Sequence, residues 1–374
     1  MVRVFTRIAK RPGTPGHGAF TQAPVLWSVL GPMMESSKKY ERTNRDIVGA
    51  VNLWCTNRAA AEEKYGHISH WNVSGVTNMA RLFESKREFN DDIGGWNVSN
   101  VRDMGFMFNG ARAFNQPIGL WNVSNVTNMS RTFSNTDKFN KAIGSWDVSN
   151  VVDMTGTFYS AKLFKQDIGG WNVSNVDSMR EMFAGAFEFN QDIGNWNVSK
   201  VSDMRGMFSN AMYFNKAIGN WNVSKVTDMA GMFVDAESFN QPIGSWNVSA
   251  VVNMRNMFAY AYEFNQPIGD WNVSRVRDMS SMFFRAKAFN QDLTRWDITY
   301  LMDYENIFLD CPGMSGANNA NRPLRFQQYQ PVLPTVDNGR YLGGVAKKSR
   351  RASQKRSRKG RRTLKRGARR TRRR

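Results

Sequence analysis

Tryptophan recurs ten times at a constant spacing of 25 residues, from Trp71 to Trp296, and this period constrains the fold more than any other feature of the chain. With each tryptophan counted as position 0 of a unit, phenylalanine occupies position +12 in all ten units and position +18 in the first nine. Methionine fills position +8 from Met79 to Met279. Such a period is the signature of stacked repeats. Because one unit has too little apolar surface to offset the entropy of ordering it, we expect neighbouring units to cover one another.

Within a unit the spacing of apolar residues changes from two to three and four. Trp96 and Val98 differ by two and would share one face of a short strand, with the intervening Asn97 pointing outward. The residues that follow have the spacing of one helical face; in the second unit they are Val101, Met104, Met107, Phe108 and Ala111. An Asp or Asn at position +7 suits the start of that helix. The pattern therefore predicts a strand followed by a helix in every unit.

Both ends of the repeat block carry sequences typical of caps. Before Trp71, two short amphipathic helices are expected, the second ending at Gly66. The residues expected on the buried face of the first helix are Ile47, Val51, Trp54 and Cys55. At the other end the tenth unit departs from the pattern, since Tyr304 replaces methionine and Met314 replaces phenylalanine. Cys311 takes a small apolar position there, which predicts a packing role and not a nucleophile.

The frame I-x-x-W-x-V-x-x-V resembles the L-x-x-L-x-L core of leucine-rich repeats. The whole unit, of which WNVSNVTNMSRTFSNTDKFNKAIGS is one copy, resembles the repeat of BspA-like surface proteins and mycoplasma lipoprotein-like proteins over about residues 45–311. The resemblance implies a right-handed solenoid with a parallel sheet, and adhesion or partner binding as its role. Members of that family occur in bacteria, protists and large DNA viruses.

These observations predict an α/β chain: a leucine-rich-repeat-like right-handed solenoid of about ten 25-residue strand–helix units. The expected organisation is a poorly ordered N-terminal segment at 1–42, a helical cap at 43–70, the solenoid at 71–311, a linker at 312–346 and a disordered polybasic tail at 347–374.

The charge of the chain is concentrated in the tail. The formal net charge is +20, and residues 347–374 hold 17 Lys or Arg and no Asp or Glu. The residues before them carry 34 basic and 31 acidic side chains, which leaves a net charge of +3. The chain before the tail is therefore close to neutral, and a polyanion is the natural partner of the tail.

The predicted nucleic-acid or polyanion site consists of the 17 tail cations: Lys347, Lys348, Arg350, Arg351, Lys355, Arg356, Arg358, Lys359, Arg361, Arg362, Lys365, Arg366, Arg369, Arg370, Arg372, Arg373 and Arg374. No aromatic residue interrupts them, which favours contact with phosphates over base stacking. A solubilising or nuclear-targeting role for this charge run and binding to anionic membranes are the alternatives.

Nothing in the sequence predicts catalysis, a cofactor or a metal. Two cysteines, Cys55 and Cys311, cannot form a disulfide framework for a chain of 374 residues, which fits a reducing compartment. His67 and His70 have no evident third ligand and are expected in an exposed turn of the cap. The chain has no secretory signal and no stretch of 18 apolar residues, so we expect a soluble protein without a transmembrane segment.

Asparagine at position +1, as in Asn97 and Asn122, forms an outward-facing column in eight of the ten units. Two interpretations are a structural ladder of stacked amides, which we favour, and a polar recognition strip. The same residues create eight Asn-Val-Ser glycosylation sequences, which the repeat itself imposes.

The sequence supports two functional hypotheses. The first is a non-enzymatic scaffold, intracellular and nuclear or virion-associated, which the tail tethers to nucleic acid while the solenoid binds an unidentified protein. Variation between units is concentrated at positions +9, +10, +13, +14, +16 and +17, where specificity should reside. The second is an adhesin-like protein of the cell surface. The sequence does not distinguish DNA from RNA and does not indicate the oligomeric state.

Overall fold

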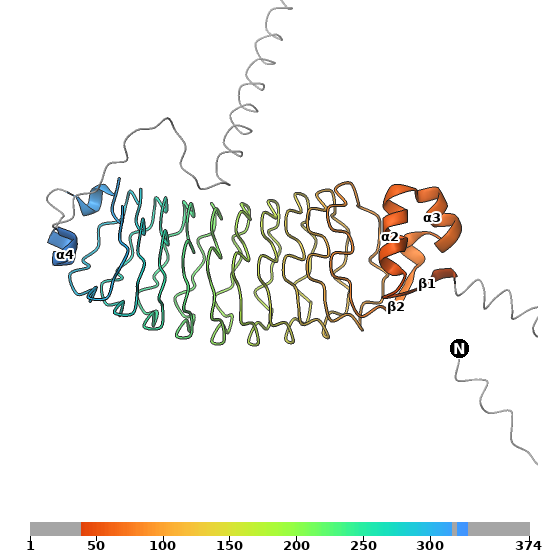
Figure 1. Ribbon diagram of the computed structural model, residues 1–374, viewed down its shortest axis with the longest axis horizontal. Helices are drawn as coiled ribbons and strands as arrows, with labels where there is room; N and C mark the ends of the chain where they lie inside the picture. Colours follow the sequence, from red (N-terminus) through yellow and green to blue (C-terminus); the bar gives the residue numbers. More distant parts are fainter. Residues whose placement is uncertain (1–38, 316–319, 328–374) are drawn as a thin grey trace, which may run out of the picture. The chain divides into compact units, whose positions relative to one another are not determined.

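The computed structural model describes residues 39–315 and 320–327 (Figure 1). Regular secondary structure among them is confined to the two ends of the repeat block. The elements before the block and in its first unit are β1 (Glu41–Thr43), α2 (Ile47–Thr56), α3 (Arg58–Tyr65), the 3₁₀ helix η2 (Ile68–His70) and β2 (Asn72–Gly75). Those at the other end are the 3₁₀ helix η3 (Pro312–Met314) and α4 (Leu324–Gln327).

The ten units lie side by side in a row, each forming one coil of chain (Figure 1). Nine parallel bridges join position +7 of one unit to position +7 of the next, from the Asn78–Asp103 pair to the Asp278–Asp303 pair. Around this bridge the N–H groups at positions +8, +10, +12 and +14 donate to carbonyls of the following unit; Phe83 N–H, for example, donates to the Met107 carbonyl at 2.8 Å. Adjacent units are therefore joined through the backbone as well as through side chains.

The predicted strand–helix unit is wrong. Between residues 76 and 311 of the described chain no α-helix occurs, and extended structure is limited to single bridge residues. The segment after the bridge is a run of tight turns, in which the N–H groups at +11, +13 and +15 bond three residues back, as Leu82 does to Met79. Positions +10 and +14 have φ between 51° and 75°. A left-handed residue at every fourth position cannot be part of an α-helix.

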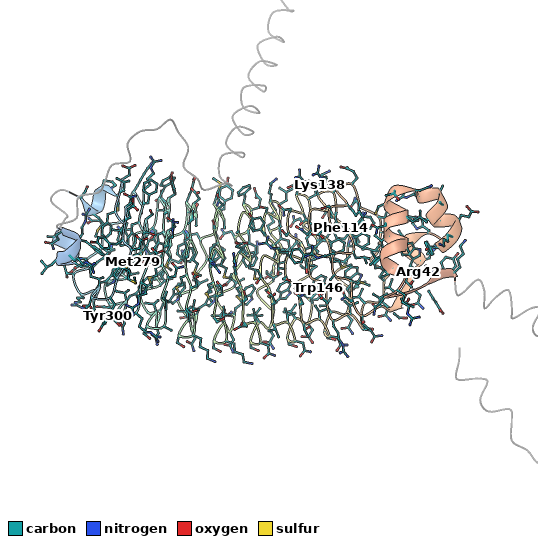
Figure 2. The ribbon with its side chains drawn as sticks, viewed as in Figure 1. Arg42, Phe114, Lys138, Trp146, Met279 and Tyr300 are labelled. Atoms are coloured by element: carbon teal, nitrogen blue, oxygen red, sulfur yellow. The ribbon has the colours of Figure 1, made fainter. Side chains whose placement is uncertain are left out.

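The side chains predicted to form the core do so, in columns that run along the row (Figure 2). Phe rings at position +12 of successive units lie 5.3–5.7 Å apart between centroids. Within a unit the +12 and +18 rings lie 3.9–4.2 Å apart. Figure 2 shows Phe114, Trp146 and Met279 in this interior. Since each ring is covered by its counterparts in adjacent units, the core extends through all ten units.

The buried tryptophans also satisfy backbone carbonyls. Each indole N–H donates to a carbonyl oxygen at 2.9–3.2 Å, and from the second tryptophan onward the acceptor lies 28 residues earlier. Trp96, for example, donates to the Ile68 carbonyl. A phenylalanine in this position would leave that carbonyl without its donor, which explains why the column is tryptophan and not simply aromatic.

Two helices cover the first unit. Trp54 of α2 packs edge-on against Trp71 at 6.0 Å between centroids, and β1 pairs in parallel with β2. Arg42 is buried, with its guanidinium 4.5 Å from the Tyr65 ring centre and paired with Asp46 at 2.8 Å. The buried residues of α2 are Ile47, Ala50, Val51 and Trp54.

The expected burial of Cys55 is wrong, because this side chain is exposed. The buried stripe of α2 is centred between Ile47 and Trp54, and Cys55, one residue beyond Trp54, is rotated about 100° away from Trp54 around the helix axis.

Residues 320–327, which the sequence places in a linker, pack against the tenth unit. Phe326 is buried, with its ring 5.8 Å from Phe308 and 5.4 Å from Tyr304. The Leu293 N–H donates to the Asn321 carbonyl at 2.8 Å, which ties this segment to the repeat block through the backbone. This segment therefore covers the end of the aromatic columns.

Glycine at position +23 permits the close approach of neighbouring coils. In eight units, from Gly94 to Gly269, a Cβ atom would lie closer than 3.0 Å to the carbonyl oxygen at position +21 of the next unit. Real Cβ atoms essentially never approach another atom that closely, and a backbone carbonyl cannot rotate away as a side chain can.

We predict that Gly169→Ala lowers the free energy of unfolding by about 1–3 kcal/mol, because the added methyl group would overlap the Asp192 carbonyl. Gly170 is the matched control: no atom lies within 4 Å of its virtual Cβ, and Gly170→Ala should be neutral or stabilise by up to about 1 kcal/mol. Chemical denaturation followed by tryptophan fluorescence measures both. Equal effects of the two substitutions would contradict this role of position +23.

Candidate functional site

The 17 tail cations that the sequence nominates, from Lys347 to Arg374, lie outside the described residues, and their role stays a prediction. Within the described chain, the candidate surface is the set of positions +9, +10, +13, +14, +16 and +17, called here the variable face. The helix expected to carry these positions is replaced by the turns described above. The turns still leave most of these side chains at least partly exposed in every unit.

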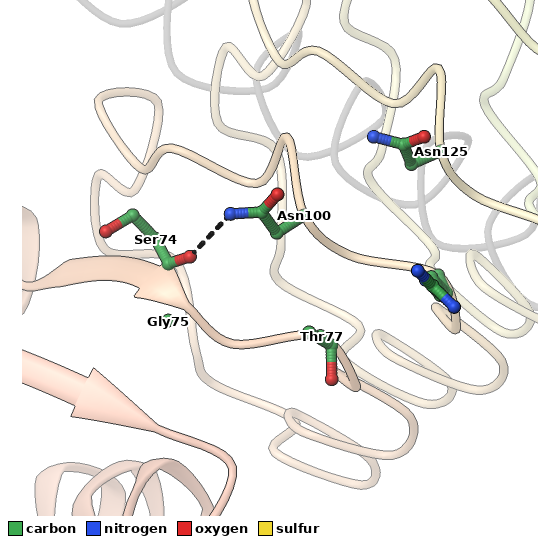
Figure 3. Close-up of a pocket in the computed structure, with 6 residues that line it drawn as sticks. Ser74, Gly75, Thr77, Asn100 and Asn125 are labelled. Carbon is green, nitrogen blue, oxygen red and sulfur yellow. Dashed lines mark hydrogen bonds between the residues drawn. The ribbon is translucent and has the colours of Figure 1, made fainter.

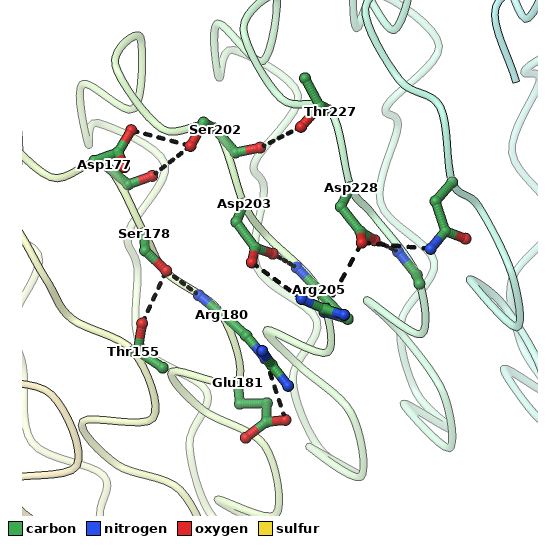
Figure 4. Close-up of polar contacts among 12 residues, drawn as sticks. Thr155, Asp177, Ser178, Arg180, Glu181, Ser202, Asp203, Arg205, Thr227 and Asp228 are labelled. Atoms are coloured by element: carbon green, nitrogen blue, oxygen red, sulfur yellow. Dashed lines mark hydrogen bonds and ion pairs between the residues drawn. The ribbon is translucent and has the colours of Figure 1, made fainter.

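The polar column at position +7 anchors the variable face. A side-chain oxygen at +7 accepts the N–H at +9 of the same unit, as Asp203 Oδ1 does from Arg205 at 2.9 Å (Figure 4). Asp228 makes the same bond to Ala230 at 2.8 Å. The prediction that these residues cap a helix is wrong, because there is no helix, but they cap the first turn by the same chemistry.

An ion pair on the variable face bridges units that are not adjacent. Arg131 Nη2 of the third unit lies 2.6 Å from Glu181 Oε2 of the fifth. The fourth unit has Gly156 between them, and its missing side chain leaves room for Arg131, whose Cγ lies 3.1 Å from the position a Cβ would take. A larger residue at 156 would obstruct the path, so three units together create this contact.

Further along the same face, Arg205 lies between two carboxylates. Its guanidinium is 3.5 Å from Asp203 and 3.8 Å from Asp228 (Figure 4). In the preceding unit, Arg180 lies 3.6 Å from Glu181. The middle of the variable face thus presents charges that already neutralise one another, so a partner there would be selected by shape and hydrogen bonding more than by net charge.

Toward the C-terminal units the variable face becomes aromatic. The Arg285 guanidinium lies 5.6 Å from the Tyr260 ring centre and 5.1 Å from that of Phe284, and Lys287 Nζ lies 4.5 Å from that of Tyr262. The hydrogen bond from Arg285 to Asp310 at 3.0 Å is the main cause of the raised pKa of Arg285. Half-exposed tyrosine and arginine side chains held by neighbours are typical anchors of protein interfaces.

A hollow of about 280 Å³ opens near the first unit, and positions +3, +4 and +6 line it (Figure 3). Its lining residues are Ser74, Gly75, Thr77, Asn100, Arg102 and Asn125. Position +4 is Asn in each of the next four units, and Gly75 in the first unit leaves this space open. Its volume is below that of a typical small-molecule pocket, so it suits a single polar or anionic group.

The asparagine column at +1 is not the predicted ladder. Each Oδ1 accepts the N–H of its own unit's residue at +3, as Asn97 does from Ser99 at 3.1 Å, and the column therefore shapes a local turn. The inter-unit ladder is formed instead at position +19, where the Asn140 N–H donates to Asn115 Oδ1 at 3.0 Å. The sequence contains both columns, and only the backbone geometry distinguishes their roles.

Groups able to support catalysis do not converge in the part of the chain that the structure describes. No cluster of three or more His, Cys, Asp or Glu there could hold a metal ion. His67 bonds to Ser69 at 2.8 Å and packs against Trp54. Cys311 is buried, as predicted, and burial raises the pKa of its thiol to about 12. Its Sγ donates to the Ala286 carbonyl at 3.2 Å, which is a packing role.

Comparison with protein families gives one result. The model of a family described as "Mycoplasma protein of unknown function, DUF285" matches residues 55–167, 132–229 and 210–320. These three overlapping matches span the repeat block. Comparisons with curated proteins and with solved structures found no match. Among the described residues, no helix has the length and apolar character needed to cross a bilayer.

We predict that a double-mutant cycle on Arg131→Gln and Glu181→Gln gives a coupling free energy of about 0.5–1 kcal/mol, since both side chains are mostly covered. Arg295 and Asp270 form the control pair: they also lie 2.6 Å apart, but their side chains are 77% and 80% exposed. Their coupling should be close to zero because water screens them. Chemical denaturation of the single and double variants measures both cycles, and equal couplings would contradict the importance of burial.

We also predict that iodoacetamide at pH 8 modifies Cys55 and not Cys311 in the folded chain. Cys311 is 1% exposed, and its pKa of about 12 keeps the thiol protonated at this pH. Desolvation also raises the pKa of Cys55, but the Cys55 side chain is exposed and the reagent can reach it. Mass spectrometry of peptides labelled before and after denaturation measures both sites. Rapid native labelling of Cys311 would show that the tenth unit is open.

Proposed function

The chain belongs to the DUF285 family, and from this premise we propose that it is a non-enzymatic scaffold that binds a protein partner and is held on nucleic acid or another polyanion by its basic tail. The family is described as one of unknown function, so membership carries no activity with it. The proposal therefore depends on the surface chemistry of the repeat block and on the composition of the tail.

The observation that carries the scaffold proposal is the contrast between the core and the variable face. The buried columns repeat almost unchanged from unit to unit, whereas positions such as Arg131, Gly156 and Glu181 differ and combine into contacts between units. A surface whose pattern does not repeat can distinguish one partner from another, which a uniform surface cannot do. The aromatic end around Tyr260 and Tyr262 adds the residue types that dominate binding energy in protein interfaces.

We further infer that this family relationship extends to BspA-like repeats and that the row of coils is a right-handed, leucine-rich-repeat-like solenoid. The parallel bridges at position +7 and the backbone bonds between consecutive units support a solenoid. The handedness follows from the resemblance of the repeat sequence alone.

The tail supplies the second part of the proposal. Seventeen cations in 28 residues would bind phosphates without reading sequence. If about half of them met phosphates of a DNA duplex, the logarithm of the affinity would fall with the logarithm of salt concentration at a slope of about −7. Such binding suits an intracellular pool of the protein, in the nucleus or inside a virion.

An adhesin-like surface protein is the second candidate, and one observation favours it. The asparagines of the eight Asn-Val-Ser sequences are exposed, Asn97 and Asn122 among them, and could therefore accept glycans in a secretory compartment. N-glycans on the endogenous protein, together with its cleavage by protease added outside intact cells, would support this candidate and exclude the intracellular scaffold.

We predict that a chain ending at Gly344 loses most of its affinity for duplex DNA at low salt and most of its salt dependence, because it lacks the 17 tail cations. Fluorescence anisotropy with a labelled duplex, measured between about 50 and 300 mM salt, gives both the affinity and its salt dependence. Equal affinities and slopes for the full and shortened chains would remove the tail from the mechanism.

A further inference from the structure

Positions +4 and +6 of the ten units form an edge of the row that is distinct from the variable face; we call these twenty positions the basic edge. In each unit these two positions lie between the turn that starts at the exposed residue of position +1 and the bridge residue at +7. The cations of this edge are Arg102, Lys200, Lys225, Arg275 and Arg277, and its one acid is Asp177. The edge therefore carries a net charge of +4, whereas residues 71–311 as a whole hold 21 basic and 25 acidic side chains, a net charge of −4.

The cations of the basic edge are exposed and form no ion pair with any described residue. Lys200 Nζ donates to Asn175 Oδ1 at 2.6 Å, and Arg277 donates to the Tyr300 carbonyl at 3.0 Å. Both partners are neutral, so the positive charges remain uncompensated. On the variable face, Arg131 and Arg205 are paired with carboxylates, whereas Arg87, Arg112 and Lys138 are exposed and form no ion pair with a described residue.

The acid of this edge is engaged by a neighbour. Asp177 Oδ1 accepts a hydrogen bond from Ser202 Oγ at 3.0 Å, so it faces the next unit's hydroxyl (Figure 4). It lies one unit before Lys200 and does not pair with it among the described contacts. Positions +4 and +6 of the units after Asp177 therefore hold no carboxylate, while position +7 beside them holds Asp203, Asp228, Asp278 and Asp303.

The spacing of the charges follows from the backbone bonds between units. Adjacent chains joined in this way lie about 4.8 Å apart. Lys200 and Lys225 occupy the same position in consecutive units, and Arg275 occupies it two units later with Arg277 beside it. Cations arranged along one edge of the row suit a linear polymer that carries negative charges along its length.

The C-terminal end of the basic edge adds exposed apolar side chains. Tyr300, at +4 of the tenth unit, is 61% exposed, and Met302 at +6 is 78% exposed. The Arg277 guanidinium lies 5.2 Å from the Tyr300 ring centre. An aromatic ring at the end of a row of cations provides a stacking surface for a base, which is the combination found in sites for single-stranded nucleic acid.

The hollow near the first unit belongs to the same edge (Figure 3). Its lining includes Arg102 at +6 and no carboxylate. The Asn100 and Asn125 amides in the lining also donate to the carbonyls of Ser74 and Ser99. With a volume of about 280 Å³, the hollow suits a single anionic group such as a phosphate. The basic edge thus has a phosphate-sized recess at one end and a stacking residue at the other.

We propose that the basic edge binds single-stranded nucleic acid, with its cations on the phosphates and Tyr300 stacked on a base. The inference deepens the proposed function, since it assigns part of the nucleic-acid contact to the repeat block. The tail supplies affinity for any polyanion, whereas the edge supplies a preference for strands whose bases are free to stack.

The test uses the full chain with Lys200→Gln, Lys225→Gln and Arg275→Gln combined. Binding of a labelled oligothymidylate of about 30 nucleotides is measured by anisotropy over a range of salt concentrations. This length exceeds the site size of a typical single-strand-binding domain. We expect at least about tenfold weaker binding at low salt, and a slope of log affinity against log salt reduced by about 2, because each lost phosphate contact contributes about 0.7.

The matched control removes the same charge from positions +16 and +17 of the variable face, to which no contact with nucleic acid is assigned, with Arg87→Gln, Arg112→Gln and Lys138→Gln. These side chains are exposed and unpaired among the described residues, and Figure 2 shows Lys138 and Tyr300 on opposite rims of the row. If only net charge matters, the two triple variants will weaken binding equally, and the proposed site is overturned.

A third variant, Tyr300→Leu, separates stacking from charge. It should weaken binding of the oligothymidylate about fivefold or more and leave binding of a duplex unchanged. An unchanged affinity for the single strand contradicts the stacking role. If the triple variant of the basic edge binds heparin more weakly but binds the oligonucleotide with unchanged affinity, the edge is a site for sulfated polysaccharide and the proposal is overturned.

The proposal for the tail and the proposal for the basic edge can be rejected independently of each other. If the chain ending at Gly344 loses all binding and the edge variants match the unsubstituted protein, the proposed function stands and this inference fails. If the shortened chain still binds the oligothymidylate and the edge variants do not, the edge is the site and the tail proposal fails. Circular dichroism of each variant establishes that it is folded.

Discussion

Hydrogen bonds between neighbouring units are the constraint on which the rest of the structure depends. Alternate N–H groups between positions +8 and +14 have their acceptors in the next unit, so a unit without its neighbour would leave buried donors unpaired. The close spacing that these bonds impose requires glycine at +23 and brings like side chains into register. The aromatic columns and the indole bonds of Trp96 and its counterparts follow from that register. Both ends of the row consequently need other segments to cover them, as α2 and Phe326 do.

The period and the identity of the core could be read from the sequence, but the local backbone could not. Met104, Met107 and Phe108 have the spacing of a helical face, and a run of three-residue turns brings the same positions inward. The difference lies in the left-handed residues at +10 and +14. Glycine at these positions in a few units, such as Gly156, indicates a left-handed backbone. Arg131 and Phe106 have the same left-handed conformation, so the residue types at this position do not predict it. Stacking energy outweighs the intrinsic preference of these residues.

The candidate surfaces were predictable to different degrees for physical reasons. The tail is visible as composition, because 17 like charges in a row need no structure to be recognised. The contact between Arg131 and Glu181 spans 50 residues and depends on a gap at Gly156, so no local pattern reveals it. The basic edge required knowing that positions +4 and +6 turn toward the same side, which the predicted strand and helix would have separated.

The architecture separates the residues that stabilise the row from those that can acquire function. A change in a core column disturbs three units at once, since each ring contacts the units before and after it. A change at +4, +6 or +9 alters one rung of an outer surface and leaves the backbone bonds between coils intact. Paired charges can therefore accumulate on one face while unpaired cations such as Lys200 and Lys225 align on another. Because the coils hold these side chains at a fixed spacing, single substitutions spaced 25 residues apart are enough to build an extended binding surface.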